Sequence, residues 1–428
     1  MASPFRSHSR AVGPKNVEIS LERRWKVEDD MIFGGKSFFL SLFLSTALLG
    51  AGTSVWAQTP PSRFVYFANA GKDFFVGDTG NVTGFAIDPT TGDLTVIPGS
   101  PFKAGINLAA VALDPCGAFA YVANFGSDNV SAFTVDPDTG TLTEIAGSPF
   151  LSSGQAPGMV TVDPTGRFAY VPNRGAPTFS DQHGITAYSI DRATGALTEI
   201  NGSPFSPDGE NTSHVTVSPD GKFAYVVHDR SDLISGYRIT PTGALSPVPG
   251  SPFSSQGVKP RILVIDPTGR FVYVPNITSN SVAGFSINPT SGTITPLPGS
   301  PYAAGNDPSG ARGSAMDPFG EFLYISNQEK NTIYAYLIDS SSGSLTLAPG
   351  SPFTGRLQLF PQTLSVEQSG QFLYVANAQS NNVSVYTIDR TTGSLTETPH
   401  SPFPVGSNPF SVTTSPAPAC NEQNAQPR

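Results

Sequence analysis

Seven copies of one sequence unit occupy the chain between about residues 63 and 416. The copy at 119–150, FAYVANFGSDNVSAFTVDPDTGTLTEIAGSPF, reads as three short strands joined by tight turns. Each copy contains a Phe-x-Tyr strand, and successive tyrosines lie 48 to 55 residues apart: Tyr66, Tyr121, Tyr170, Tyr225, Tyr273, Tyr324 and Tyr374. A period of about 50 residues with several strands per unit is typical of β-propellers. One unit cannot bury both faces of its own sheet, so we expect the copies to fold as a set.

The order of signals within each copy predicts four strands. An apolar run ends in Asp-Pro or a variant of it, and a glycine turn then leads into the Phe-x-Tyr strand. A third strand follows, and a Thr/Ser-Gly turn joins it to a short fourth strand, because glycine supplies the positive φ of such turns. Ser-Pro-Phe or Ser-Pro-Tyr ends the unit, where proline forces the chain out of the sheet. We therefore predict an all-β fold, a seven-bladed β-propeller of four-stranded antiparallel blades.

The two ends of the repeat array are complementary. The first copy lacks its opening strand, and the last copy is followed by a surplus one at Phe410–Pro416, FSVTTSP. We expect this C-terminal strand to pair with the first blade and close the ring, which removes the open edges. The propeller is predicted to span 58–418 as one domain, with a tail at 419–428.

Residues 1–57 read as a separate N-terminal region. Lys36, the apolar run Ser37–Gly50 and the small-residue site Val55–Ala57 form a secretory signal over 31–57, preceded by an extension at 1–30. The alternative is a membrane anchor, but the run is short and the chain turns polar directly after it. We predict cleavage near Gln58, a secreted or periplasmic protein, and no membrane span after cleavage. The mature chain carries 17 basic and 28 acidic residues, which argues against nucleic acid as a partner.

The positions that break the repeat are the candidates for chemistry. The residues that open the innermost strands are, around the ring, Phe410, Ala109, Gly158, Ser213, Arg261, Arg312 and Gln362. Polar and charged side chains therefore gather on blades four to six. His183, His214 and His228 map to the same face of the ring, near blades three and four. Concave sites with a few convergent polar groups are the usual ligand sites, so we expect a pocket at the channel mouth.

The repeat resembles the lactonase family of seven-bladed propellers. The resemblance rests on Tyr-Val-Ala/Pro-Asn at Tyr121–Asn124, Tyr170–Asn173, Tyr273–Asn276 and Tyr374–Asn377, together with Asp-Pro-x-Thr-Gly turns. The family includes propeller 6-phosphogluconolactonases and carboxymuconate-lactonizing enzymes. It implies an Arg-His pair that opens one innermost strand and an Asn-Glu pair that ends the next strand. Here the matching positions are Ser213-His214 and His228-Asp229, so the histidine is retained, Ser213 stands for the arginine and Asp229 for the glutamate.

Two functions follow as expectations. In the first, the protein hydrolyses a small lactone: His214 acts as general base, Asp229 orients it, and His228 lies beside them. Arg261 and Arg312 hold a carboxylate or phosphate or stabilise an oxyanion, with Ser213, Gln362 and His183 as further binding residues. In the second, the channel rim is solvated and the protein is a non-catalytic binding or scaffold propeller of the cell envelope.

No compact ligand motif supports a metal site built from the three histidines, so we expect no metal and no cofactor. The expected partner is a small molecule, and the expected state is a monomer. Cys116 lies in the turn after the second blade's innermost strand, and Cys420 lies four residues after Pro416. Both positions fall on one face of adjacent blades in an exported chain, so a Cys116–Cys420 disulfide is predicted to tether the closing strand.

Overall fold

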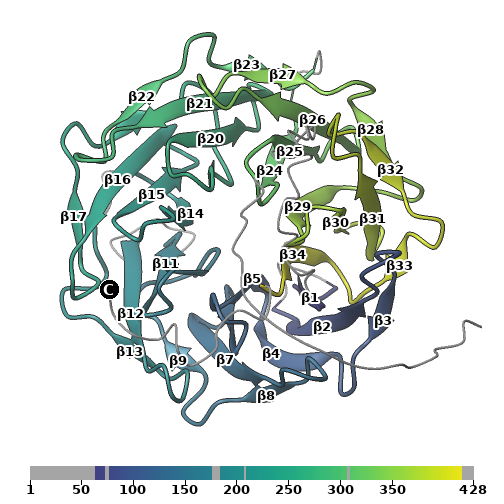
Figure 1. The fold of residues 1–428 in the computed structure, drawn as a ribbon. Helices are drawn as coiled ribbons and strands as arrows, with labels where there is room; N and C mark the ends of the chain where they lie inside the picture. Colours follow the sequence, from purple (N-terminus) through teal and green to yellow (C-terminus); the bar gives the residue numbers. More distant parts are fainter. Residues whose placement is uncertain (1–62, 73–76, 176–183, 207–208, 306–308, 417–428) are drawn as a thin grey trace, which may run out of the picture. The chain divides into compact units, whose positions relative to one another are not determined.

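The computed structural model describes residues 63–72, 77–175, 184–206, 209–305 and 309–416. The chain divides into two units, Met1–Trp56 and Ala57–Arg428, and every described residue belongs to the second. The described residues of this unit form strands and turns, without helices, in seven antiparallel sheets arranged as a ring (Figure 1). The predicted all-β, seven-bladed propeller is confirmed.

Blade 2 shows the plan that all blades share. Its strands run from the channel outward as β5 (Leu108–Leu113), β6 (Phe119–Asn124), β7 (Asn129–Val135) and β8 (Leu142–Glu144). Blade 1 has β34 (Pro409–Thr414), β1 (Phe64–Asn69), β2 (Thr79–Ile87) and β3 (Leu94–Val96), and blade 3 has β10 (Thr161–Val162), β11 (Phe168–Asn173), β12 (Gly184–Ile190) and β13 (Leu197–Glu199). Blade 4 has β14 (Thr212–Val217), β15 (Phe223–His228), β16 (Leu233–Ile239) and β17 (Leu245–Pro247), and blade 5 has β19 (Val264–Ile265), β20 (Phe271–Asn276), β21 (Ser281–Ile287) and β22 (Ile294–Pro296). Blade 6 has β24 (Ala311–Met316), β25 (Phe322–Asn327), β26 (Thr332–Ile338) and β27 (Leu345–Leu347), and blade 7 has β29 (Pro361–Val366), β30 (Phe372–Asn377), β31 (Asn382–Ile388) and β32 (Leu395–Glu397).

The chain leaves the fourth strand at Ser-Pro, as expected, but it then pairs with the sheet again. In blade 2, β8 pairs only with Phe133–Val135 of β7, because it is three residues long. The residues after Pro149, β9 (Phe150–Leu151), pair with the other end of β7 at Asn129 and Val130. Short strands of the same kind are β4 (Phe102–Ile106), β18 (Phe253–Ser254), β23 (Tyr302–Ala303), β28 (Phe353–Thr354) and β33 (Phe403–Pro404). They cover the part of the third strand that the short fourth strand leaves unpaired.

The ring is closed by the C-terminal strand. β34 pairs antiparallel with β1, with Tyr66 opposite Thr413 and Phe67 opposite Val412 (Figure 1). The backbone N–H of Phe64 also donates to Ser415 Oγ at 3.0 Å. The first blade therefore takes its innermost strand from the end of the chain, and the predicted closure is confirmed.

The apolar core lies between neighbouring blades. One buried cluster joins Phe64, Tyr66 and Val82 of blade 1 to Val111 and Val122 of blade 2. Each Phe-x-Tyr tyrosine is buried, and its hydroxyl donates to the backbone carbonyl of the Thr/Ser-Gly turn in the next blade. The seven bonds are Tyr66–Gly140, Tyr121–Gly195, Tyr170–Gly243, Tyr225–Gly292, Tyr273–Gly343, Tyr324–Gly393 and Tyr374–Gly92. The last of them joins blade 7 to blade 1, so the same contact runs round the whole ring.

Glycine is required in these turns for two reasons. Gly140 has a φ of +72°, which L side chains rarely adopt. A Cβ on Gly140 would also lie 2.6 Å from the ring of Phe64 in the preceding blade. The Thr/Ser-Gly signal of the repeat therefore marks a contact between blades as well as a tight turn.

Candidate functional site at the channel mouth

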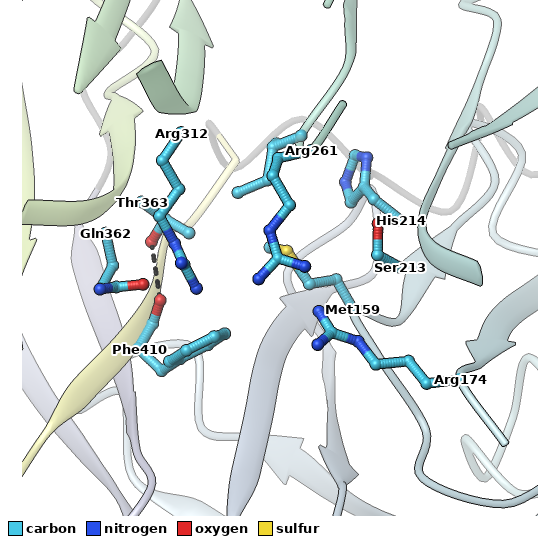
Figure 2. A pocket seen from close by; sticks show the side chains of 10 residues that line it. Met159, Arg174, Ser213, His214, Arg261, Arg312, Gln362, Thr363 and Phe410 are labelled. Atoms are coloured by element: carbon cyan, nitrogen blue, oxygen red, sulfur yellow. Dashed lines mark hydrogen bonds between the residues drawn. The ribbon is translucent and has the colours of Figure 1, made fainter. Parts of the chain in front are cut away.

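A small pocket lies where the innermost strands begin, with a cavity volume of about 10 Å³ (Figure 2). It receives side chains from six of the seven blades. Its lining residues are Met159, Arg174, Ser213, His214, Arg261, Ile262, Arg312, Gln362, Thr363 and Phe410. Figure 2 shows the three guanidinium groups pointing toward one another across the pocket, with His214 and Ser213 on one side and Gln362 on the other. We call this cavity the channel pocket.

Breaks in the strand ladders bring these residues to the channel. The pairing of β14 with β15 shifts between Thr212 and His214, so Ser213 is an extra residue on the inner strand. In blade 5, Pro260 bridges to Asn276 and regular pairing resumes only at Val264. Arg261 therefore lies outside the ladder that we expected it to open. Such bulges re-aim side chains at a rim, and here they turn polar residues into the channel.

Arg261 is held by the carboxylate of Asp229. Arg261 Nη1 lies 2.6 Å from Asp229 Oδ2, and both side chains are buried. Asn211 Nδ2 donates to the other carboxylate oxygen, Oδ1. This corrects the role expected for Asp229, since both of its oxygens bind Arg261 and Asn211 instead of orienting His214. The ion pair fixes the guanidinium at the base of the pocket.

His214 lines the channel pocket with 9% of its surface exposed. Its Nδ1 lies 3.4 Å from Thr216 Oγ1, a long contact. Burial, and then the positive charge of Arg261, lower the pKa of His214 from 6.5 to about 4. The imidazole is therefore neutral at ordinary pH and has a lone pair available to accept a proton.

His228 does not line the pocket, in contrast to the expected position beside His214. It is fully buried at the end of β15, with Nε2 2.8 Å from Ser235 Oγ and Nδ1 3.4 Å from Thr212 Oγ1. Other blades have asparagine at this position: Asn124 Nδ2 donates to Ser131 Oγ at 2.9 Å, and Asn377 Nδ2 donates to Ser384 Oγ at 2.9 Å. His228 makes the same kind of bond to a serine hydroxyl as that asparagine does. Its side chain therefore lies inside the blade and not in the channel. His183 lies outside the described residues.

Two further arginines complete the pocket. Arg312 Nη1 donates to Gln328 Oε1 at 2.9 Å, and its guanidinium carbon lies 5.2 Å from the ring centre of Phe410. Arg174 lies 6.0 Å from the ring centre of Phe125, and its buried Nε has no hydrogen-bond partner. Burial, and then the charge of Arg261, lower the pKa of Arg174 to about 9, and the same two causes lower that of Arg312. Guanidinium groups keep their positive charge in proteins, so the pocket brings three cations together.

The sequence reasoning missed Arg174, although a signal for it exists. Arg174 directly follows Asn173, the position that ends the Phe-x-Tyr strand of its blade. The same position in other blades holds Phe125, Asp229 and Gln328, and each of these contacts an arginine of the pocket. The residue after the strand-ending asparagine therefore forms a second column around the channel, beside the column of inner-strand openings.

The fold agrees with the comparisons to known proteins. The family model described as "Lactonase, 7-bladed beta-propeller" matches residues 62–209, 185–308 and 306–413. The chain belongs to the lactonase family of seven-bladed β-propellers. No curated protein matches the chain.

Several solved structures share this fold at low sequence identity. A candidate 6-phosphogluconolactonase from Bacteroides fragilis is 22% identical with a TM-score of 0.68, covering 82% of this chain and 98% of that one. A protein from Lactobacillus plantarum is 21% identical with a TM-score of 0.67, covering 82% and 99%. The periplasmic gluconolactonase of Pseudomonas aeruginosa is 19% identical with a TM-score of 0.66, covering 83% and 100%.

In this lactonase-family propeller the channel pocket opens beside an outer cavity over blades three to five. Arg174 and Arg261 line both the channel pocket and this outer cavity, which has a volume of about 460 Å³ and is also lined by Asp229, Arg230, Asp232 and Lys259. A ligand can therefore reach the arginines from the rim. The described residues contain no group of three His, Cys, Asp or Glu side chains that would hold a metal ion.

Two other expectations concern parts of the chain away from the pocket. Cys116, in the turn between β5 and β6, is disulfide-bonded, while the predicted partner Cys420 lies outside the described residues. Pro416, the last residue described, lies beside this turn, since a Cβ on Gly117 would be 3.3 Å from its ring. Within the described ranges, no helix is long and apolar enough to cross a membrane.

Proposed function

We propose that this lactonase-family propeller hydrolyses a small lactone in the channel pocket. The observation that carries the proposal is the meeting of a neutral histidine with three arginines at the channel mouth (Figure 2). A neutral imidazole can accept a proton from water, and guanidinium groups stabilise negative charge on oxygen. These are the two requirements for adding water to an ester carbonyl.

The proposed reaction uses groups that already face the pocket. Water attacks the lactone carbonyl carbon while His214 accepts a proton from it, and the carbonyl oxygen becomes an oxyanion. Arg261, fixed by Asp229, and Arg312 stabilise that oxyanion. The ring C–O bond then breaks, the proton on His214 passes to the leaving alkoxide, and an open-chain hydroxy acid results. Ser213 and Gln362 are in place to hydrogen-bond the substrate.

Export is part of the proposal. The signal-like segment 31–57 precedes the propeller, and the similar protein from Pseudomonas aeruginosa is described as periplasmic. Secretion disfavours a sugar phosphate as substrate, because sugar phosphates are made and kept in the cytoplasm. N-terminal sequencing of material recovered outside the cytoplasm should start near Gln58, and a sequence that retains residues 31–57 would contradict cleavage.

A binding propeller without turnover is the second candidate. One observation favours it: Asp229 is paired with Arg261, and the described contacts give His214 no carboxylate partner that would strengthen it as a base. In this case the arginines hold an anion that the protein carries or senses.

A lactone panel separates the two candidates. Purified protein is given five- and six-membered lactones, with and without a carboxylate substituent, and acid release is followed by titration at constant pH. Turnover that falls about 100-fold or more in His214→Ala supports hydrolysis at the pocket. The matched control is His400→Ala, since His400 is an exposed histidine of blade 7 that pairs with Asp93. No turnover by the wild type with any lactone of the panel would favour the binding propeller.

A further inference from the structure

The channel pocket brings three guanidinium groups together around very little space. Arg174, Arg261 and Arg312 line it, and they come from blades 3, 5 and 6 (Figure 2). The cavity volume is about 10 Å³, which is close to the least volume that holds one water molecule. A ligand that lies between the three groups is therefore about the size of a single heavy atom.

One carboxylate faces these three positive charges. Asp229 Oδ2 lies 2.6 Å from Arg261 Nη1. In the part of the chain that the structure describes, no carboxylate pairs with Arg174 or Arg312, and Arg312 donates to the neutral amide of Gln328. Burial, and after it the positive charges of Arg261 and Arg174, lower the pKa of Arg312, so the three groups are close enough to repel one another. The pocket therefore has an excess of positive charge.

The surroundings of the pocket do not supply the missing negative charge. The adjoining outer cavity adds the cationic side chains of Arg230 and Lys259 and the single carboxylate of Asp232. Arginine keeps its proton in proteins, so the excess charge is not relieved by deprotonation. Buried charge is costly unless it is paired, so the pocket favours an anion taken up from solution.

The pocket also has hydrogen-bond donors that the protein leaves unused. Ser213 Oγ and Arg174 Nε are buried without a hydrogen-bond partner, and both residues line the pocket. The Nε–H of arginine can only donate, and a serine hydroxyl can donate as well. A ligand that only accepts hydrogen bonds suits both groups. Gln362 Oε1 is also without a partner, but it is an acceptor on the opposite side of the arginines and stands outside this set (Figure 2).

We propose that the channel pocket is a binding site for one halide ion, which is chloride in ordinary salt solutions. A halide is monatomic and negatively charged, and it accepts hydrogen bonds from several donors while offering none. Arg174, Arg312 and the Ser213 hydroxyl donate to it, and Arg261 adds positive charge at the base of the pocket. Sulfate, phosphate and carboxylates also carry negative charge, but they are too large for a cavity of about 10 Å³.

The halide site also affects the proposed hydrolysis, and this part of the inference rests on that function. The oxyanion of the proposed reaction needs the same guanidinium groups, so chloride should compete with the lactone. A lactone ring is larger than the channel pocket, and the adjoining outer cavity of about 460 Å³ has room for it. Chloride then occupies the place of one substrate oxygen and inhibits the reaction.

Chloride NMR on the purified mature chain tests the binding. The chloride signal broadens when the ion exchanges between solution and an ordered site on the protein. We expect excess broadening that saturates as chloride is added, in a background of sodium methanesulfonate at constant ionic strength. Bromide should displace the bound chloride at a concentration at least about tenfold lower than methanesulfonate needs. Broadening that does not saturate, or equal displacement by the two anions, would overturn the proposal.

Matched variants locate the site. Arg174→Gln and Arg312→Gln should each weaken chloride binding by about tenfold or more, because each removes a charged donor. Ser213→Ala keeps every charge and removes one donor, so it should weaken binding less. Arg356→Gln is the control, since Arg356 is exposed and pairs with Glu397, and it should leave chloride binding unchanged. Thermal melting checks that each variant is folded. Unchanged chloride affinity in the folded variants of the pocket would contradict this location.

The two proposals fail in different ways. A chain that binds chloride but hydrolyses no lactone in chloride-free buffer contradicts the proposed function and leaves the halide site standing. A chain that hydrolyses lactones equally fast with and without chloride, and that shows no saturable broadening, contradicts the halide site and leaves the proposed function standing.

Discussion

Single residues that break the repeat make the channel pocket. Most positions recur in every blade because they shape turns or pack between blades, and these serve the scaffold. Ser213, Arg261 and Arg312 occupy inner-strand openings at which two other blades have Ala109 or Gly158. The charges that result are not balanced within the pocket, because Asp229, which pairs directly with Arg261, is one negative charge among three guanidinium groups. The energetics of the site therefore depend on a few buried charges, and two predictions concern them.

The first prediction concerns the Arg261–Asp229 ion pair. Asp229→Asn removes the charge that compensates Arg261, so it should lower the free energy of unfolding by about 3–5 kcal/mol, as measured by urea denaturation. The control is Asp138→Asn, which breaks an exposed pair with Arg63 and should cost no more than about 1 kcal/mol. Similar losses of unfolding free energy in the two variants would show that the buried pair contributes no more to stability than an exposed one.

The second prediction concerns the pH dependence of stability. The folded protein holds the pKa of His214 at about 4, below the 6.5 of a free histidine, because burial and Arg261 disfavour the charged form. Between these values the unfolded chain binds the proton more readily, so the stability present above pH 6.5 is lost as the pH falls toward 4. His214→Asn should melt at a temperature that changes less between pH 6.5 and pH 4 than the wild type does. Parallel pH profiles for the two proteins would contradict the assignment to His214.

At the scale of strands, the residues of the channel pocket come from two places: the start of each innermost strand and the end of the Phe-x-Tyr strand that pairs with it. The ladder between them is interrupted in blades 1, 2, 4, 6 and 7, and in blades 4, 6 and 7 the residues at the break line the channel pocket. The residue that ends a Phe-x-Tyr strand, one position before these pocket contacts, instead bonds side chains inside its own blade in blades 2, 4 and 7. His228 shows the difference, since it lies next to Asp229 in sequence and yet bonds Ser235 inside the blade.

The third prediction follows from this position of His228. His228→Asn restores the residue of the other blades and should leave lactone turnover and melting temperature near the wild-type values. His228→Ala leaves Ser235 Oγ without its buried partner and should cost about 1–3 kcal/mol of unfolding free energy. Both are measured by urea denaturation together with the titration assay. A large loss of lactone turnover in a His228→Asn protein of unchanged stability would contradict this and indicate a catalytic role for His228.

At the scale of the propeller unit, stability depends on closing the ring. Each blade buries its faces only against its neighbours, and the tyrosine-to-glycine bonds continue across the seam as Tyr374 to Gly92. β34 supplies the missing inner strand of blade 1, and its Val412 packs in the cluster that joins blades 7 and 1. Closure also shapes the channel pocket, because the ring of Phe410 on this strand contacts the guanidinium group of Arg312.

The fourth prediction tests this closure by truncation. A chain that ends at residue 408 lacks β34, so blade 1 exposes the edge of β1 and the seam core, and the protein should lose its cooperative melting transition. A chain that ends at residue 416 keeps β34 and loses Cys420. It should still melt cooperatively, with a stability lower by about 3–5 kcal/mol if the predicted Cys116–Cys420 bond forms. Cooperative melting of the shorter chain would show that the ring does not need its closing strand.

The sequence alone determined the blades, their number, the closing strand and the sector of the channel that is polar. These features depend on local signals, such as period, turn residues and strand alternation, which repeat often enough to be read without a structure. The structure alone decided which charges meet. Arg174 and Arg261 come from different blades, Asp229 binds an arginine instead of His214, and His228 turns into its blade. Such contacts depend on where bulges interrupt the ladders and on the angle between neighbouring blades, and no spacing along the chain encodes either.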